Sequence, residues 1–81
     1  HIPVIEIESN IVHITVGEVL HPMEEAHYIE WIYLETNKGV KRADLNPGNN
    51  PEAYFALTEG EEIVRAFAYC NLHGLWVKEM K

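Results

Sequence analysis

The segment Val4–Val16 has the sequence VIEIESNIVHITV, and it decides the fold class. Apolar and acidic residues alternate up to Glu8, Ser9 and Asn10 can turn the chain, and a second run of β-formers follows in Ile11–Val16. Alternation with a period of two is typical of a strand with one buried face, and a short polar interruption is typical of a hairpin. The chain is therefore predicted to start with an antiparallel β-hairpin.

Five more β-rich runs follow, separated by turn-forming residues: His27–Thr36, Val40–Ala43, Ala53–Leu57, Ile63–Cys70 and Leu75–Glu79. Two prolines in Asn46–Pro51 exclude a central strand there, so we expect a loop that crosses between sheets. Only Pro22–Ala26 offers a helical turn. Seven short strands separated by turns predict an all-β fold, an immunoglobulin-like antiparallel β-sandwich.

Composition excludes several classes of function. With 81 residues and 9.3 kDa, the chain is one domain, residues 1–81, with a core small enough for a metal or an oligomer interface to help stabilise it. The net charge of −7 and six scattered basic residues argue against nucleic acid as a partner. No apolar run approaches the roughly 20 residues that span a membrane, so no membrane partner is expected.

One cysteine cannot form an internal disulfide, and no signal-peptide pattern is present, so the expected location is the cytoplasm. The chain begins at His1 without a methionine, and we expect a short N-terminal segment to precede it. Apolar faces exposed on strands of so short a chain also predict a homo-oligomer.

The most informative motif for chemistry is CNLHGLW, Cys70–Trp76, because it places the only cysteine three residues before a histidine. That spacing lets one tight turn present a thiolate and an imidazole to one metal, and Gly74 permits an unusual backbone conformation beside it. A Cys-x-x-His pair alone is a weak signal, since a lone cysteine is more often a small buried hydrophobe.

Three further histidines, His1, His21 and His27, strengthen the case for a metal. On a strand, His21 and His27 would lie roughly 20 Å apart, and on a helix they would lie on different faces. Bringing both to one ion therefore requires a loop or a single turn, which Pro22 can open. His13 lies within a strand pattern without a nearby partner, and we do not expect it to be a ligand.

Four imidazoles and one thiolate exceed the four ligands of a structural zinc site, so iron is the better candidate. A square pyramid of histidines with an axial sulfur would leave one position open for a small ligand and for catalysis by electron transfer. Two alternatives stay open. The same donors could serve a non-catalytic electron-transfer protein, or the chain could be a metal-free β-sandwich interaction module whose histidines are incidental.

Two long motifs resemble the superoxide reductase family, which includes neelaredoxin and the iron-binding domain of desulfoferrodoxin. They are HPM-x-x-x-HYI-x-WI at His21–Ile32 and CNLHGLW at Cys70–Trp76, and the opening HIPVI is similar to the family's first-ligand segment. The resemblance implies an immunoglobulin-like β-fold with one mononuclear iron (Fe2+/Fe3+). Its ligands would be four equatorial histidines and an axial cysteine: His1, His21, His27, His73 and Cys70.

The resemblance also implies a reaction: ferrous iron reduces superoxide to hydrogen peroxide, and an external donor, in this family usually rubredoxin, reduces the iron again. Trp76 and Tyr28 are expected to cover the ligand loops. In the family a glutamate and a lysine directly precede the first histidine, and neither is present in this chain, so no catalytic residue can be assigned. We expect both upstream of His1. No four-cysteine iron site accompanies the domain.

Overall fold

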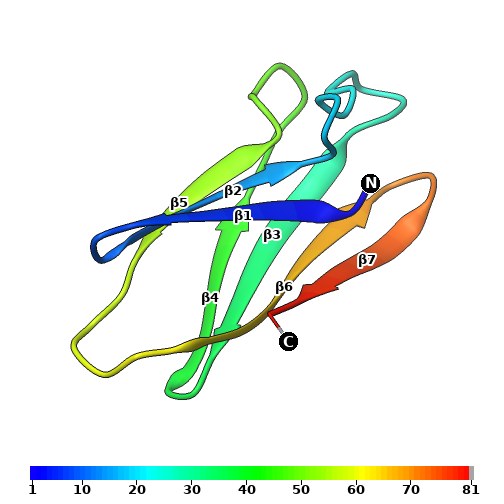
Figure 1. Cartoon of the computed structure of the whole chain (residues 1–81). Coiled ribbons are helices and arrows are strands. Elements are labelled where there is room, and N and C mark those ends of the chain that lie inside the picture. The colour runs from blue at the N-terminus through cyan, green and yellow to red at the C-terminus, as the bar shows by residue number, and fades with distance from the viewer. Residues whose placement is uncertain (81) are drawn as a thin grey trace.

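The computed structural model describes residues 1–80 and contains seven strands and, within those residues, no helix (Figure 1). The all-β prediction is thus confirmed. None of the described residues forms a helix that could cross a membrane. The strands are β1 Pro3–Glu8, β2 Ile11–Val16, β3 Ile29–Thr36, β4 Gly39–Asp44, β5 Glu52–Ala56, β6 Ile63–Cys70 and β7 Gly74–Glu79.

The strands form two antiparallel sheets, one of order β1-β2-β5 and the other of order β4-β3-β6-β7. The chain changes sheet between β2 and β3, again between β4 and β5 at the predicted Asn46–Pro51 loop, and a third time between β5 and β6 (Figure 1). At each of these three points, strands that are consecutive in the sequence lie in different sheets, as in immunoglobulin-like sandwiches. The predicted sandwich architecture is confirmed.

The predicted opening hairpin is present, and β1 pairs with β2 in antiparallel fashion. Ile5 faces Ile14 across the pair, and Glu8 faces Ile11 beside the turn, where Ser9 adopts a positive φ of 54°. Alternate residues of β2 are fully buried: Val12, Ile14 and Val16. This inner face packs against the second sheet, while the intervening residues point outward.

Strand β3 departs from simple alternation at its start. Ile29 and Ile32 are both fully buried although they are three residues apart. A register shift between Ile29 and Trp31 in the pairing with β6 explains this, because a β-bulge inserts one residue and changes which face the next residue occupies. The strand begins at Ile29 rather than at His27, because His27 pairs with Glu24 in an isolated bridge outside the sheet.

The core is small and lies between the two sheets. Cys70, the last residue of β6, belongs to it and is fully buried. The cysteine sulfur is therefore held at one end of the hydrophobic core. The buried apolar residues are Val12, Ile14, Val16, Ile29, Ile32, Leu34, Ala53, Ala66, Ala68 and Cys70.

Candidate metal centre

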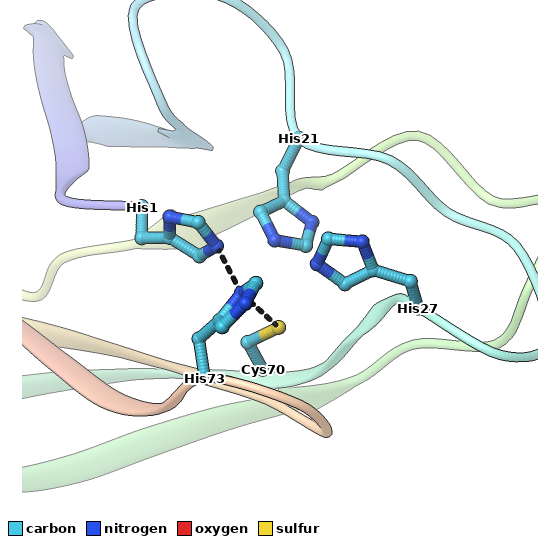
Figure 2. Close-up of side chains that lie close together, drawn as sticks. All are labelled: His1, His21, His27, Cys70 and His73. Carbon is cyan, nitrogen blue, oxygen red and sulfur yellow. Dashed lines mark hydrogen bonds between the residues drawn. The ribbon is translucent and has the colours of Figure 1, made fainter.

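One end of the sandwich collects all five residues of the predicted ligand set. His1 precedes β1, His21 and His27 lie on the β2–β3 connection, Cys70 ends β6, and His73 lies in the β6–β7 turn. Figure 2 shows their side chains pointing toward a common centre. One donor atom from each residue lies within 4.8 Å of every other. Segments distant in sequence thus supply five donors to one small volume.

The β2–β3 connection bends back sharply to deliver two of these histidines. Gly17 has a φ of 84°, and the amide of His21 donates to the carbonyl of Val16 at 3.1 Å. Further along, the backbones of Glu24 and His27 exchange two hydrogen bonds of 2.9 Å each. A tight reverse turn, one of the two possibilities that the spacing allowed, therefore brings His27 back toward His21.

The tautomer of the neutral His21 ring is fixed by a backbone group. Its Nδ1 donates to the carbonyl of Pro22 at 2.7 Å, and since a carbonyl only accepts, Nδ1 carries the proton. Burial lowers the pKa of His21 below 6.5; the Pro22 hydrogen bond opposes this shift and the nearby His27 adds to it. The neutral ring then presents the lone pair of Nε2, which is the form that binds a metal.

Two nitrogen atoms in the centre are buried without a hydrogen-bond partner: Nε2 of His21 and Nε2 of His27. Buried polar atoms almost always have a partner, because leaving one unsatisfied costs about 1–3 kcal/mol. A metal ion would satisfy both lone pairs at once. This pair of orphaned atoms is the strongest structural indication that the site is built for an ion.

The four imidazoles are arranged around a ring. Adjacent rings lie edge to face, with centroids 4.5 Å apart for His1 and His21, 4.6 Å for His21 and His27, 5.0 Å for His27 and His73, and 4.7 Å for His73 and His1. His1 and His27 face each other across it at 6.2 Å. Four nearly equal sides and a longer diagonal describe an approximate square.

The sulfur lies close to this square. Cys70 Sγ is 3.9 Å from His73 Nδ1, which in turn is 2.8 Å from His1 Nε2 (Figure 2). Metal–nitrogen and metal–sulfur bonds of about 2.1 and 2.3 Å separate donors on opposite sides of one ion by about 4–4.5 Å. The observed spread of 4.8 Å or less therefore fits five donors around one transition-metal ion.

The centre is closed on one side and open on the other. Cys70 and His21 are buried, whereas His1 and His73 are exposed. Trp76 stacks on His1 at 5.0 Å and its indole N–H donates to the carbonyl of His73 at 3.2 Å, so the predicted covering role of Trp76 is supported. Solvent therefore reaches the histidine ring from the side of His1 and His73.

Asn71 has a structural role that sequence reasoning did not assign. Its side-chain oxygen accepts from the amide of Tyr28 at 2.9 Å, and its side-chain nitrogen donates to the carbonyl of Ala26 at 3.2 Å. A third bond joins the Asn71 amide to the Tyr28 carbonyl at 3.1 Å. Tyr28 thus contributes through its backbone. The sequence signal for this role was a short amide side chain directly after the candidate ligand Cys70.

His13 lies apart from the five-residue cluster, as predicted. It is on β2, where its Nε2 lies 2.7 Å from Glu52 and its ring stacks on Tyr54 at 4.2 Å. Its ring nitrogens already have carboxylate partners, with Glu6 at 3.6 Å from Nδ1. It is a surface residue of the β1-β2-β5 sheet.

Fold and site together define a class: small antiparallel β-sandwich proteins with a five-donor histidine and cysteine site at one end. Comparison with known sequences narrows the class to a family. The family model described as Desulfoferrodoxin matches residues 1–79. The chain therefore belongs to the desulfoferrodoxin and superoxide reductase family.

Relatives from several organisms support this assignment. A desulfoferrodoxin homolog of Archaeoglobus fulgidus is 53% identical over 76 residues, which cover 94% of this chain and 59% of the relative. A superoxide reductase of Pyrococcus horikoshii is 35% identical, covering the whole chain and 85% of the relative. The chain spans about three fifths of the length of the desulfoferrodoxins that it matches.

Solved structures give the same result. The superoxide reductase of Treponema pallidum superposes with a TM-score of 0.94 and 43% identity, covering 98% of this chain and 65% of the other. The one-iron superoxide reductase of Giardia intestinalis has a TM-score of 0.84 and 35% identity, covering the whole chain and 96% of the other. The fold is therefore found both within longer chains and nearly alone.

Proposed function

We propose that this chain is a superoxide reductase centre that reduces superoxide to hydrogen peroxide at one mononuclear iron. The observation that carries the proposal is the square of four imidazoles with a buried cysteine sulfur beside it, open to solvent near His1 and His73. Proteins named superoxide reductase among its relatives and structural neighbours support the proposal.

The donor set favours iron over zinc. His1, His21, His27 and His73 would hold the metal through imidazole nitrogens and Cys70 through its thiolate, which is one ligand more than a tetrahedral zinc site takes. Imidazole suits iron, and a thiolate donates electron density to a redox-active metal. When bound, ferrous iron supplies one electron to superoxide, which takes up two protons and leaves as hydrogen peroxide.

The residues around the candidate site have two further roles, which are support of the donors and access for the substrate. Burial of Cys70 and His21 keeps water from the sulfur side and holds two donors in buried positions, Cys70 within the core. Exposure of His1 and His73 leaves the opposite side accessible to a small anion. The site therefore combines rigid support on one side with access on the other, as catalysis at a metal with an open position requires.

Electrostatics near the opening matter because superoxide is an anion and the chain has a net charge of −7. Lys78 and His1 line the same groove, together with Glu18. Within the described residues, Lys78 is the cation that we propose attracts the anion, and it would act at a distance because it lies on β7 four residues beyond Gly74, which pairs with Cys70. A one-electron donor such as rubredoxin would reduce the iron after each turnover.

Two measurements test the proposal. The chain is reconstituted with ferrous iron under anaerobic conditions, and we expect stoichiometric iron and, after oxidation, an absorption band that Cys70→Ser abolishes. Stopped-flow mixing with superoxide is then expected to oxidise the iron rapidly with formation of peroxide. His13→Ala is the matched control and should retain both properties, since His13 lies outside the centre.

Each failure points to a different alternative. Failure to bind iron in the wild-type chain would support the metal-free interaction module. Stoichiometric iron without rapid oxidation by superoxide would support the non-catalytic electron-transfer protein. Either result would overturn the proposed reductase.

A further inference from the structure

Met23 lies in the loop between two of the candidate ligands, two residues after His21 and four before His27. It is partly buried and packs against the hydrophobic core, whereas its neighbours Pro22 and Glu24 are exposed. The loop therefore turns one side chain inward between its two histidines, and that side chain carries a sulfur atom.

The sulfur of Met23 has a specific partner. The backbone amide of Ile29 donates to Sδ at 3.3 Å. Ile29 is fully buried and lies at the register shift where β3 begins, so its amide is shielded from water. Buried amides almost always have an acceptor. Methionine combines an apolar side chain that packs against a core with a thioether that accepts a hydrogen bond, whereas a leucine of similar volume would leave this amide without a partner.

This hydrogen bond closes a loop around His27. The segment from Met23 to Ile29 contains His27 and is fastened inside by the two backbone hydrogen bonds between Glu24 and His27. The carbonyl of Met23 also accepts from the amide of Gly48 at 2.9 Å, which joins the loop to the β4–β5 connection. Since His27 Nε2 is buried without a hydrogen-bond partner, the backbone of this segment decides where that atom points. Met23 is therefore a positioning residue for His27.

We propose that Met23 is a site of oxidation by hydrogen peroxide, and that its sulfoxide releases His27 from its position in the centre. In this reaction one peroxide oxygen forms a bond to the sulfur, the O–O bond breaks, and the other oxygen leaves as water. The thioether loses two electrons and the peroxide gains them. The proposal rests on the proposed function for the source of the peroxide, which would form at the neighbouring metal centre.

Oxidation weakens the hydrogen bond to Ile29 whichever side of the sulfur takes the oxygen. An oxygen that accepts from this amide needs about 2.7–3.2 Å to the nitrogen, which is nearly all of the 3.3 Å between nitrogen and sulfur. The sulfur, and the loop with it, must then move away. An oxygen on the other side leaves an electron-poor sulfur that accepts poorly, and it adds a polar group where Met23 packs against the core.

The other methionine, Met80, provides an internal comparison. It follows β7, is 42% exposed and lies in the groove that includes His1. Among the hydrogen bonds of residues 1–80, the one that Met80 makes runs from its backbone amide to the carbonyl of Val64 and leaves the sulfur uninvolved. Peroxide should therefore oxidise Met80 readily, but without disturbing a contact that holds a ligand.

The experiment adds reagent hydrogen peroxide to the iron-loaded chain, so it does not require reductase activity. Met80→Leu leaves Met23 as the only methionine, and Met23→Leu leaves Met80; both changes conserve side-chain volume. Peptide mass spectrometry locates the added oxygen, and chelator competition measures metal affinity. In Met80→Leu we expect affinity to fall about tenfold as Met23 gains one oxygen, and to recover after treatment with the two methionine sulfoxide reductases, one for each epimer.

Met23→Leu is expected to bind the metal about tenfold more weakly from the start, because it lacks the acceptor, and peroxide should weaken it no further. The absorption band of the oxidised iron should shift both in Met23→Leu and in the peroxide-treated Met80→Leu, since a displaced His27 changes the centre. A general loss of stability would leave the band of the bound metal in place.

Oxidation of Met23 without a change in metal affinity would overturn the proposal. So would an equal loss of affinity in both variants, which would make another group, such as Cys70, the target. Resistance of Met23 after complete conversion of Met80 in the wild type would overturn it as well. If Met23→Leu does not fold, recovery of Met80→Leu with the reductases still assigns the loss to Met23. None of these outcomes decides whether the iron reduces superoxide, which stopped-flow mixing tests separately.

Discussion

The side chain of Asn71 bonds both peptide groups that flank His27. It accepts from Tyr28 and donates to Ala26, so the residue after the cysteine holds the segment that carries a histidine donor. The two candidate ligands concerned, Cys70 and His27, lie on different loops. Asn71 therefore fixes the distance between the Cys70 sulfur and the His27 ring nitrogen, which belong to segments far apart in the sequence. Residues that support metal ligands have this role.

Asn71→Ala is expected to weaken metal binding more than it weakens the fold. Loss of two hydrogen bonds should lower the free energy of unfolding by about 1–3 kcal/mol, and loosening of His27 should reduce metal affinity about 10–100-fold. Chelator competition measures the second effect. The control is Asn37→Ala, which likewise removes one accepted and one donated hydrogen bond, from the Glu62 amide and to the Gly60 carbonyl, in the β3–β4 turn at the other end of β3. Equal losses of affinity in both variants would contradict a specific role for Asn71.

Much of the fold follows from local sequence patterns. The remaining parts of the fold depend on contacts between distant segments. Alternation and turn residues predicted seven strands and the loop between sheets. The bulge after Ile29 was missed, because its signature is a change of face that only pairing with β6 reveals. Similarly, spacing showed that His21 and His27 needed a turn, but not the reverse turn at Glu24 that provides it.

The candidate site, too, could be predicted only in part from local sequence patterns. Residue type and motif picked out the five donors, since thiolates and imidazoles are rare and chemically specific. Their square arrangement and the clamp by Asn71 arise because the N-terminus, the β2–β3 connection and the β6–β7 turn meet in space. Local sequence patterns do not show which segments meet, so these features required the structure.

Gly17→Ala is expected to disturb the loop that carries His21. The φ of 84° disfavours any side chain, and an added Cβ would lie 2.5 Å from the backbone oxygen of Val19. We expect a loss of about 1–3 kcal/mol in stability together with weaker metal binding. Gly60→Ala is the control, because its φ of 79° imposes the same strain and its nearest atom is 3.8 Å away. A Gly17→Ala variant no worse than this control would contradict the steric argument.

Removal of the metal is expected to destabilise the chain markedly. Without an ion, the Nε2 atoms of His21 and His27 remain buried without partners, and no ion joins His1 to the donors of the other segments. A ligand present at 1,000 times its dissociation constant stabilises the folded state by about 4 kcal/mol. Calorimetry of the iron-loaded and iron-free forms should therefore show a clearly lower thermal midpoint without iron. Equal midpoints would show that the centre contributes nothing to the fold.

Glu61 is expected to make stability depend on acid pH. The Thr36 hydroxyl, followed by the Thr58 amide, donates to its carboxylate and lowers its pKa from 4.5 to about 2. A pKa lowered on folding favours the charged form, so this contribution is complete above about pH 4.5 and disappears as the pH falls toward 2. The difference in thermal midpoint between wild type and Glu61→Gln should shrink over that window.

The control for this prediction is Glu62→Gln, at the exposed neighbouring position. This change should leave the pH dependence of the wild type intact, because the Asn37 side chain contacts the backbone amide of Glu62 and not its carboxylate. A difference between wild type and Glu61→Gln that stays constant from pH 7 to pH 2 would rule out the carboxylate of Glu61 as the titrating group.

Lys78→Glu is expected to slow the reaction with superoxide without changing iron content. Lys78 shares a groove with His1, so reversing its charge should reduce the second-order rate constant about threefold at low ionic strength. Added salt should shrink the difference, since screening acts within about 10 Å at 0.1 M. Lys38→Glu changes the net charge equally but lies in the β3–β4 turn, at the other end of β3. If both variants react equally slowly, net charge rather than local attraction governs the approach of the anion.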